Sequence, residues 1–513
     1  MKKRMVWQVM VCVIGSLFIF IHPSTGFFVF RNQFLSADDT IVVHLDCERV
    51  SGMIRPFGHI NDGPAPIKNE ASYTDLSDQY QEIGITAIRT HDLFGPTDIT
   101  TIFSNLSADP TDASNYHFET SDPLITRMIE AGTQIFYRLG ESASNNHTLK
   151  NPPANFTVWA EVCKHITMHY NEGWNNGFFY NIVYWEIWNE PDLLGFWNGT
   201  ADQYYQLYHL TAETLKTHNS SLKIGGPCTS SISNGNYTTG FLQYVKDHDA
   251  PLDFFSWHRY AGAPYDYYAD SLYVRHLLDS YGFTNTENIN SEWNIDILSP
   301  QRDKDNAKNA AFTACSLTVF QDAQLDYAFR YRGNQENNWL MRFLGLDLGL
   351  FSYNGIYKRP AVIYRVMKDI TQDTPLRLQT PVMNASDGIT YLAGISKDKK
   401  NVSVLVSNFN AADISYHLEL TNVPWNSTYR VVRYLIDETH HLEIVNNTQQ
   451  STSPYVNMQT LKKNSIHFYR FTNSSMIPKE GPEVAQIPLL LRFRFLDPLT
   501  RILAILLVLI ILN

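Results

Sequence analysis

Between residues 51 and 374, short apolar runs of strand length alternate with longer stretches whose apolar residues recur at helical spacing. The short runs stop at polar residues and lie at 57–61, 83–92, 134–141, 182–190, 222–227, 252–260, 288–294 and 325–331. Helical spacing occupies residues 123–131, 156–170, 201–217, 304–320 and 359–370. Repeated strand–helix units of this kind predict an α/β fold, a (β/α)8 TIM barrel whose active site lies at the carboxyl ends of the strands.

The pattern changes on both sides of this barrel. Residues 375–475 contain alternating strand-like runs without intervening helices, at 390–395, 402–407, 429–434 and 465–471. Such runs are typical of a β-sandwich, which would form an accessory domain. Residues 27–50 carry further strand-like runs, and we expect them to join the sandwich instead of starting the barrel. We interpret the sandwich as a packing partner of the barrel, with a separate carbohydrate-binding module as the alternative.

The two ends of the chain have the composition of targeting segments. Residues 1–26 combine a basic start, an apolar run and small residues, which predicts a secretory signal peptide; an uncleaved signal anchor is the alternative. Residues 476–513 form a polar spacer and an apolar tail, which predicts a GPI-anchor signal, with a short terminal membrane helix as the alternative. Glycosylation sequons also favour a secreted or extracellular surface protein. They begin at Asn105, Asn146, Asn155, Asn198, Asn219, Asn236, Asn384, Asn401, Asn426, Asn446 and Asn473.

Composition narrows the class of partner. Aromatic residues make up 13% of the chain and charged residues 18%, as in a packed globular protein. The net charge of −11 at pH 7 argues against a nucleic acid or an anionic membrane surface as partner. The cysteines that remain after the signal show no C-x-x-C spacing for zinc, but they could form up to two disulfides, with the pairing open. They are Cys47, Cys163, Cys228 and Cys315.

The most specific motif lies at residues 182–192, where an apolar and aromatic run stops at Asn189-Glu190-Pro191. Proline cannot donate a hydrogen bond to a strand ladder, so the strand must end there, with Asn189 and Glu190 at its carboxyl end. Burial among neighbouring tryptophans would raise the pKa of Glu190, as a general acid requires. These tryptophans are Trp185, Trp188 and Trp197.

A second strand-like run ends in a carboxylate beside a tryptophan, at Glu292-Trp293-Asn294. Two strand-end glutamates on one barrel suggest the paired carboxylates of glycoside hydrolysis. Together with Trp188-Asn189-Glu190-Pro191 and the Lys-Ile-Gly-Gly-Pro run at 223–227, this spacing resembles glycoside hydrolase family 39. The known members of that family are chiefly β-xylosidases and α-L-iduronidases. The resemblance extends from about residue 57 through the sandwich.

The resemblance implies roles for individual residues. It makes Glu190 the acid/base and Glu292 the nucleophile of a retaining mechanism that passes through a glycosyl-enzyme, and it places Asn189 against the sugar 2-hydroxyl. The other substrate-binding positions that it implies are Arg89, His91, His258, Tyr260, His59 and Glu336. Strand alternation adds that Arg89 and His91 can both face the barrel mouth. A core position is the alternative for His91, and a supporting position behind the sugar ligands is the alternative for His59. No metal or organic cofactor is predicted, because two carboxylates suffice for this chemistry.

Substrate class depends on a few positions. Where the iduronidase members have a lysine, this chain has Tyr260, as the xylosidases do, which favours a neutral sugar. Glu336-Asn337 stands where the xylosidases have two glutamates, and Arg330 and Arg332 would suit an acidic sugar. The leading hypothesis is a β-xylosidase-like retaining exo-glycosidase that acts on an oligosaccharide or glycoside. The alternatives are an α-L-iduronidase-like glycosidase acting on uronic-acid sugars and a catalytically silent sugar-binding protein; the oligomeric state is left open.

Overall fold

The computed structural model describes residues 40–64, 74–91, 95–142, 150–334, 344–352, 354–380, 388–425, 428–451 and 453–473. The predicted signal peptide, the apolar tail and Glu336 lie outside the described residues. None of the helices in these ranges combines the length and the apolarity needed to span a bilayer.

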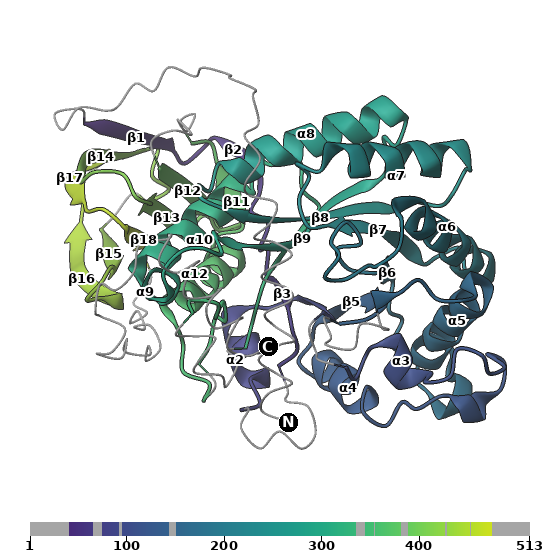
Figure 1. Ribbon diagram of the computed structural model, residues 1–513. Helices are drawn as coiled ribbons and strands as arrows, with labels where there is room; N and C mark the ends of the chain where they lie inside the picture. Colours follow the sequence, from purple (N-terminus) through teal and green to yellow (C-terminus); the bar gives the residue numbers. More distant parts are fainter. Residues whose placement is uncertain are drawn as a thin grey trace.

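Eight parallel strands close into a barrel in the described part of the chain, and helices surround it (Figure 1). The strands are β3 (His59–Asn61), β4 (Ala87–Arg89), β5 (Gln134–Leu139), β6 (Tyr184–Ile187), β7 (Lys223–Thr229), β8 (Phe254–Ala261), β9 (Glu287–Ile295) and β10 (Tyr327–Arg330). The helices are α2 (Ser77–Ile83), α3 (Ile99–Ile102), α4 (Asp122–Glu130), α5 (Phe156–Glu172), α6 (Ala201–His218), α7 (Gly235–Asp247), α8 (Asp266–Tyr281), α9 (Gln301–Asp305), α10 (Ala307–Val319) and α12 (Arg359–Asp373). The predicted (β/α)8 fold class is confirmed.

Local sequence signals fix the ends of several helices. The Asn155 side chain accepts hydrogen bonds from the first turn of α5, and Gly173 ends that helix at φ 74°. A capping box of Thr200 and Gln203 starts α6. Helices α7 and α8 have weaker signals: α7 starts at a glycine, and α8 ends at Gly282 with φ 96° but has no side-chain N-cap and mixes its apolar residues with tyrosine and aspartate. The sequence pattern therefore predicts neither of them.

Two predicted elements differ in the structure. The helix expected at 304–320 is broken at Asn306, whose extended backbone and side-chain cap end α9 and start α10. The strand expected to stop near Glu292 continues to Ile295. Its pairing with β8 skips Ser291, because Trp257 lies opposite Asn290 and His258 lies opposite Glu292. This β-bulge turns the Glu292 side chain toward the barrel mouth although the strand has not ended.

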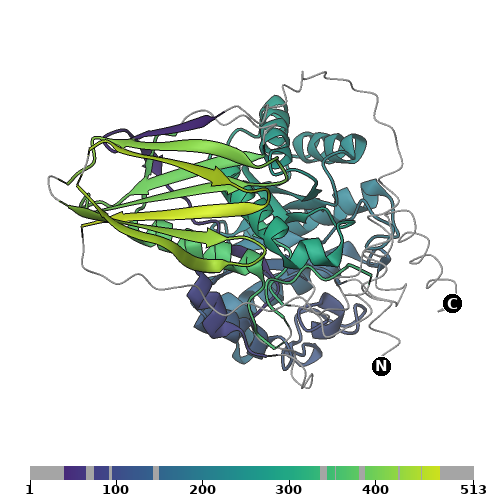
Figure 2. The same cartoon turned by 90° about the vertical axis from the view of Figure 1, so that its left-hand side faces the viewer.

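The accessory domain consists of two sheets that face each other (Figure 2). The larger sheet has the order β16 (His441–Gln450), β15 (Tyr429–Ile436), β18 (Ser465–Thr472), β13 (Asn401–Asn408), β12 (Ile389–Ile395), β11 (Leu376–Leu378) and β2 (Val50–Met53). The smaller one has the order β1 (Ile41–Asp46), β14 (Ile414–Thr421) and β17 (Tyr455–Leu461). Side chains of both sheets, such as Val43, Val404 and Leu418, form a core of their own. Strands that come before the barrel and after it therefore build one sandwich.

The central strands of the larger sheet, β12, β13 and β18, are buried on both faces because the second face packs on the barrel helices. Leu405, Val432 and Phe468 belong to the same apolar cluster as the barrel core. The ring of Phe312 on α10 lies 5.2 Å from that of Phe409, and Arg359 on α12 donates to the carbonyl oxygen of Asp437 at 3.0 Å. These contacts support the interpretation of the sandwich as a packing partner of the barrel.

The cysteines in the described residues are all free thiols. Cys47, Cys163, Cys228 and Cys315 are buried on different elements and are not paired with one another. The disulfides that the sequence allowed are therefore not formed. Burial instead makes these cysteines small apolar core residues, with Cys228 as the exception discussed below.

Candidate active site

Strand β6 carries the first predicted catalytic residue to the barrel mouth. The strand ends at Ile187, and the chain then turns through two residues with positive φ, Trp188 at 73° and Glu190 at 45°. The Trp188 amide donates to Leu139 O at 2.7 Å, and the Glu190 amide donates to Cys228 O at 3.0 Å. Backbone strain of this kind persists where neighbouring strands hold the turn. Glu190 is thus fixed between β5 and β7.

The tryptophans around the motif brace its backbone from outside the barrel. The ring of Trp185 stacks on Tyr137 at 4.9 Å, and that of Trp188 lies edge-on to Trp197 at 5.0 Å. The indole of Trp188 also donates to Phe196 O at 3.1 Å. These rings hold the strand and the loop that follows it.

Both predicted carboxylates meet at one imidazole. Nδ1 of His258 lies 2.8 Å from Oε1 of Glu190 and 3.6 Å from Oε2 of Glu292. The three side chains are buried, with residue exposures of 0% for His258, 6% for Glu190 and 4% for Glu292. Burial, followed by the charge of Arg89, lowers the pKa of His258 well below its ordinary value. His258 is therefore a neutral hydrogen-bonding group between two acids.

Glu292 receives its own set of donors. The Tyr260 hydroxyl donates to Oε2 at 2.7 Å, Arg89 donates to Oε1 at 3.0 Å, and Nε2 of His91 lies 3.4 Å from Oε1. Burial and Glu292 itself raise the pKa of Tyr260 well above its ordinary value, so the phenol keeps its proton. Donors of this kind favour the ionised form of a carboxylate.

The guanidinium of Arg89 bonds five residues of the site. It donates to Glu186 Oε2 at 2.6 Å, Asn61 Oδ1 at 2.9 Å, Glu292 Oε1 at 3.0 Å, Asn189 Oδ1 at 2.8 Å and Cys228 Sγ at 3.0 Å. Burial alone would lower the pKa of Arg89, but the neighbouring Cys228, Glu186 and Glu292 raise it, so the charge is retained. An arginine has five N–H donors, and all are used. Arg89 therefore positions the site residues, and its guanidinium has no N–H left over for the predicted sugar contact.

The side-chain amide of Asn189 is hydrogen-bonded through its oxygen. Oδ1 accepts from Arg89, while Nδ2 is buried and has no hydrogen-bond partner within the described residues. A buried N–H without a partner costs free energy unless a ligand accepts from it. This N–H would suit a substrate hydroxyl, and the contact of Asn189 with the sugar 2-hydroxyl stays a prediction.

One predicted position, His59, lies away from the carboxylates. His59 begins β3 at the opposite end of the barrel, where its ring packs 4.8 Å from Tyr327 and 5.4 Å from Phe329. Burial and Arg55 lower the pKa of His59 to about 3. The structure thus gives His59 a core position and not a sugar contact. Glu336 lies outside the described residues.

The two arginines considered for an acidic sugar are already engaged. Arg330 is fully buried, donates to Thr313 Oγ1 at 2.8 Å and lies over the Trp293 ring. Arg332 donates to Asp62 Oδ2 through two nitrogens, at 3.0 and 2.8 Å. Arg330 therefore serves the packing of the barrel, and the charge of Arg332 is balanced by Asp62.

Sequence reasoning missed three residues of the site: Glu186, Cys228 and Asn61. Glu186 had a usable signal, because a carboxylate between Trp185 and Ile187 on a buried strand requires a cation nearby. Cys228 and Asn61 had none, since a single thiol or amide at a strand end is common.

The carboxylate pair and His258 also have the chemistry of metal ligands. One donor atom from each of Glu190, His258 and Glu292 lies within 4.8 Å of the other two, and among the described residues this is the cluster that would suit an ion. These donors are engaged by protein partners, since His258 bonds Glu190, and Arg89 and Tyr260 bond Glu292. We therefore assign them no metal-binding role.

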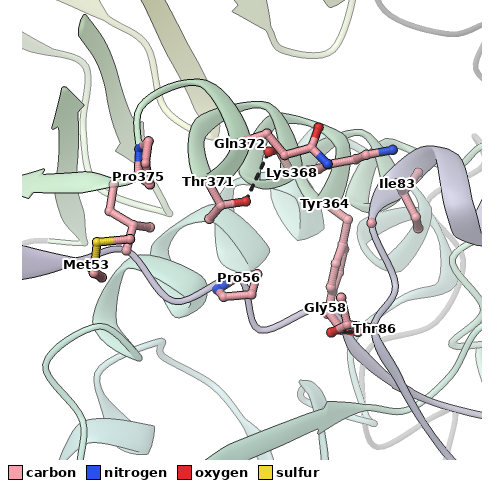
Figure 3. A pocket seen from close by; sticks show the side chains of 12 residues that line it. Met53, Pro56, Gly58, Ile83, Thr86, Tyr364, Lys368, Thr371, Gln372 and Pro375 are labelled. Carbon is pink, nitrogen blue, oxygen red and sulfur yellow. Dashed lines mark hydrogen bonds between the residues drawn. The ribbon is translucent and has the colours of Figure 1, made fainter. Parts of the chain in front are cut away.

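A cavity of about 280 Å³ lies at the other end of the barrel strands (Figure 3). It is bordered by Gly58 before β3, Thr86 before β4, Tyr364 and Lys368 on α12, and Met53 of the sandwich. Lys368 is the charged group in its wall, and its ammonium donates to the carbonyl oxygens of Gln81 and Glu82. This cavity offers no acid–base pair and is not the active site.

A barrel with two carboxylates paired at its carboxyl end is the arrangement that retaining glycoside hydrolases use. The chain belongs to family 39 of the glycosyl hydrolases, whose sequence profile matches residues 41–370. It is 26% identical over 232 residues to a beta-xylosidase of Geobacillus stearothermophilus, which covers 42% of this chain and 45% of that protein. A beta-xylosidase of Caldicellulosiruptor saccharolyticus is 27% identical over 194 residues, or 35% of this chain and 37% of that one. The chain thus matches less than half the length of these relatives.

Solved structures resemble this chain over a larger share. A glucosidase from Croceicoccus marinus superposes with a TM-score of 0.74 and 26% identity, over 85% of this chain and 100% of that one. A beta-xylosidase from Caulobacter crescentus superposes with a TM-score of 0.65 over 84% of this chain and 99% of that one. At 17% identity, the second comparison supports the fold alone.

A further buried acid borders the barrel mouth. Glu141 follows β5, and both the backbone amide and the hydroxyl of Thr100 donate to it, at 3.0 and 2.7 Å. Burial, together with Asp98, raises the pKa of Glu141 from an ordinary value of 4.5 to about 8. Between these two pH values the folded state holds a proton that the unfolded chain has released. Stability therefore falls as pH rises through this window, by up to about 1.4 kcal/mol per pH unit.

Replacing Glu141 with Gln is expected to flatten this pH dependence, because the amide has the shape of the protonated acid and no proton to lose. Thermal unfolding at pH 5 and pH 8 measures the effect. The wild-type Tm should drop by at least roughly 2 °C more than the Tm of Glu141→Gln. Glu119→Gln is the control, since the Glu119 side chain is 77% exposed. Equal drops in wild type and Glu141→Gln would contradict the prediction.

Proposed function

We propose that this chain is a β-xylosidase-like retaining exo-glycosidase, with Glu292 as nucleophile and Glu190 as acid/base. The observation that carries the proposal is the position of both carboxylates beside Nδ1 of His258, with oxygens within 4.8 Å of each other. Retaining enzymes hold their two carboxyl groups about 5–5.5 Å apart, whereas inverting enzymes leave about 6.5–9.5 Å for a water. The short separation supports retention.

In the first step, Glu292 attacks the anomeric carbon from one face while Glu190 gives its proton to the leaving oxygen. In the second step, Glu190 takes a proton from water, which attacks the glycosyl-enzyme from the other face and releases Glu292. The donors around each acid match these tasks. Glu292 accepts hydrogen bonds from a cation and a phenol, which favour its ionised form, while the neutral His258 bonds Glu190.

The proposed sugar is neutral. Tyr260 occupies the position of the lysine that the iduronidases carry, and its hydroxyl is committed to Glu292. Arg330 and Arg332 are both engaged elsewhere. A glucoside is the second candidate, since the glucosidase from Croceicoccus marinus resembles this chain over 85% of its length. We also propose that the protein is secreted or displayed on the extracellular surface, on the grounds of residues 1–26 and the glycosylation sequons.

The proposal is tested by assaying the full chain against 4-nitrophenyl β-xyloside, 4-nitrophenyl β-glucoside and an aryl α-L-iduronide. We expect the xyloside to be hydrolysed with the highest kcat/KM. Proton NMR of the first product should show β-xylose before mutarotation, which is the sign of retention. Initial release of α-xylose would overturn the retaining mechanism. Preferred hydrolysis of the iduronide would overturn the neutral sugar, and turnover of no glycoside would favour the sugar-binding alternative.

A further inference from the structure

A thiol lies in the wall of the carboxylate site. Cys228 is near the end of β7, is fully buried and has a positive φ of 56°. Its carbonyl oxygen accepts from the Glu190 amide, which joins it to the acid/base turn. The two-carboxylate mechanism gives its side chain no task, although that side chain points at the centre of the site.

The Cys228 sulfur is surrounded by polar site residues. Sγ lies 3.0 Å from Nε2 of His258, 3.0 Å from Nη2 of Arg89, 3.4 Å from Oδ1 of Asn189 and 3.6 Å from Oγ of Ser291. Burial raises the pKa of Cys228 well above its ordinary value, so the thiol keeps its proton. A guanidinium can only donate, so Sγ accepts from Arg89. The thiol has two acceptors in reach, Oδ1 of Asn189 and Nε2 of His258. Oδ1 already accepts from Arg89, so we assign the S–H proton to Nε2, which is the nearer of the two.

This donation decides which nitrogen of His258 carries hydrogen. A neutral imidazole has one N–H and one acceptor nitrogen, and the partner of one nitrogen fixes the state of the other. With Nε2 accepting from the thiol, the N–H lies on Nδ1. Nδ1 is 2.8 Å from Oε1 of Glu190, so it donates to that oxygen.

We propose that Cys228 is a positioning residue, which fixes the tautomer of His258 so that the imidazole donates to Oε1 of Glu190. The inference rests on the acid/base role proposed for Glu190. The catalytic proton passes from the Glu190 carboxyl to the glycosidic oxygen in the first step and from water to that carboxylate in the second. His258 and Cys228 keep their protons throughout.

Removing the thiol is expected to change the tautomer of His258, which a loss of packing alone would not do. Without it, His258 can adopt the other tautomer, in which Nδ1 accepts from the protonated Glu190. A donor at Oε1 favours the ionised acid, and an acceptor favours the protonated one. The basic limb of the kcat/KM profile, which follows loss of the Glu190 proton, should then move to higher pH. The charged and titratable groups around this pair are Arg89 on β4, His91 after β4, Glu186 on β6, Cys228 on β7, Tyr260 on β8 and Glu292 on β9.

The test compares pH profiles of kcat/KM for the full-length wild type, Cys228→Ala and Cys228→Ser. We expect Cys228→Ala to shift the basic limb upward by about 0.5–1 pH unit and to lower kcat by roughly 10-fold. Cys228→Ser should restore the limb, because a hydroxyl also donates to Nε2. Cys163→Ala is the control for removal of a buried thiol, since Cys163 is fully buried on α5. Its basic limb should stay in place.

Two results would overturn the inference. One is an active Cys228→Ala enzyme with an unshifted basic limb. The other is an ¹⁵N NMR spectrum of the wild type in which His258 carries its proton on Nε2, a readout that needs neither turnover nor a folded variant. Failure of the proposed function looks different, because the wild type would then hydrolyse none of the glycosides tested.

Discussion

Glu292→Gln is expected to lower kcat/KM on an aryl β-xyloside by at least about 10⁴-fold, with the fold intact. An amide cannot attack the anomeric carbon, so the glycosyl-enzyme does not form. The amide keeps the shape of the carboxylate, but its NH₂ group would face one of the two donors, Arg89 or Tyr260, that Glu292 now accepts from. Part of the hydrogen-bond network is therefore expected to rearrange.

Steady-state assays measure the loss of kcat/KM. Rescue by azide then shows whether that loss comes from removal of the nucleophile. In Glu292→Gly, azide can occupy the space of the carboxylate and attack from the same face, which gives a glycosyl azide of inverted configuration. Glu287→Gln is a matched control, because Glu287 starts the same strand at the far end and pairs with Lys223. A Glu292→Gln enzyme within 10-fold of wild type would remove Glu292 from the mechanism.

Glu190→Ala is expected to show a loss that depends on the leaving group. A poor leaving group such as an alkyl alcohol needs a proton as the bond breaks, and general acid catalysis supplies about 10²–10⁴-fold. Dinitrophenol leaves without a proton, so the first step with a dinitrophenyl xyloside should be nearly unchanged and the glycosyl-enzyme should accumulate. The measurement is kcat/KM for both substrates, together with a pre-steady-state burst of dinitrophenol.

The configuration of the azide product distinguishes an acid/base from a nucleophile. In Glu190→Ala azide should accelerate turnover and give a glycosyl azide of retained configuration, because it attacks the glycosyl-enzyme from the face of the missing acid. Equal losses on both substrates would show that Glu190 is not the proton donor. An inverted azide product would exchange the roles of the two glutamates.

The barrel and the two carboxylates could be predicted because each produces a recognisable pattern in a short stretch of sequence. A buried parallel strand reads as an apolar run, and Pro191 limits the strand that precedes it. Glu292 was found for a partly wrong reason, since its strand continues to Ile295 and a bulge directs its side chain. A bulge depends on pairing with β8, and that pairing cannot be read from one strand alone.

The supporting residues could not be assigned in the same way, because their roles depend on contacts between strands. Arg89 was predicted to face the mouth, and it does, but its donors are consumed by residues of β3, β6, β7 and β9. His59 lies two residues before Asn61, and it is Asn61 that reaches Arg89. A strand of three residues gives no sign of which of them stands at the mouth.

The origin of the sandwich strands has a consequence for synthesis of the chain. The β1 segment is synthesised before the barrel, yet its partner β14 comes 375 residues later, as the pair His44 and Glu419 shows. At about 5–20 residues per second, a ribosome needs roughly 20–75 s to deliver that partner. During this time the apolar side chains of Val43 and Leu45 lack the sheet that buries them. The barrel is therefore synthesised while β1 still lacks its partner strand. A truncation that removes β1 would leave β14 without this partner, although β14 is synthesised after the barrel.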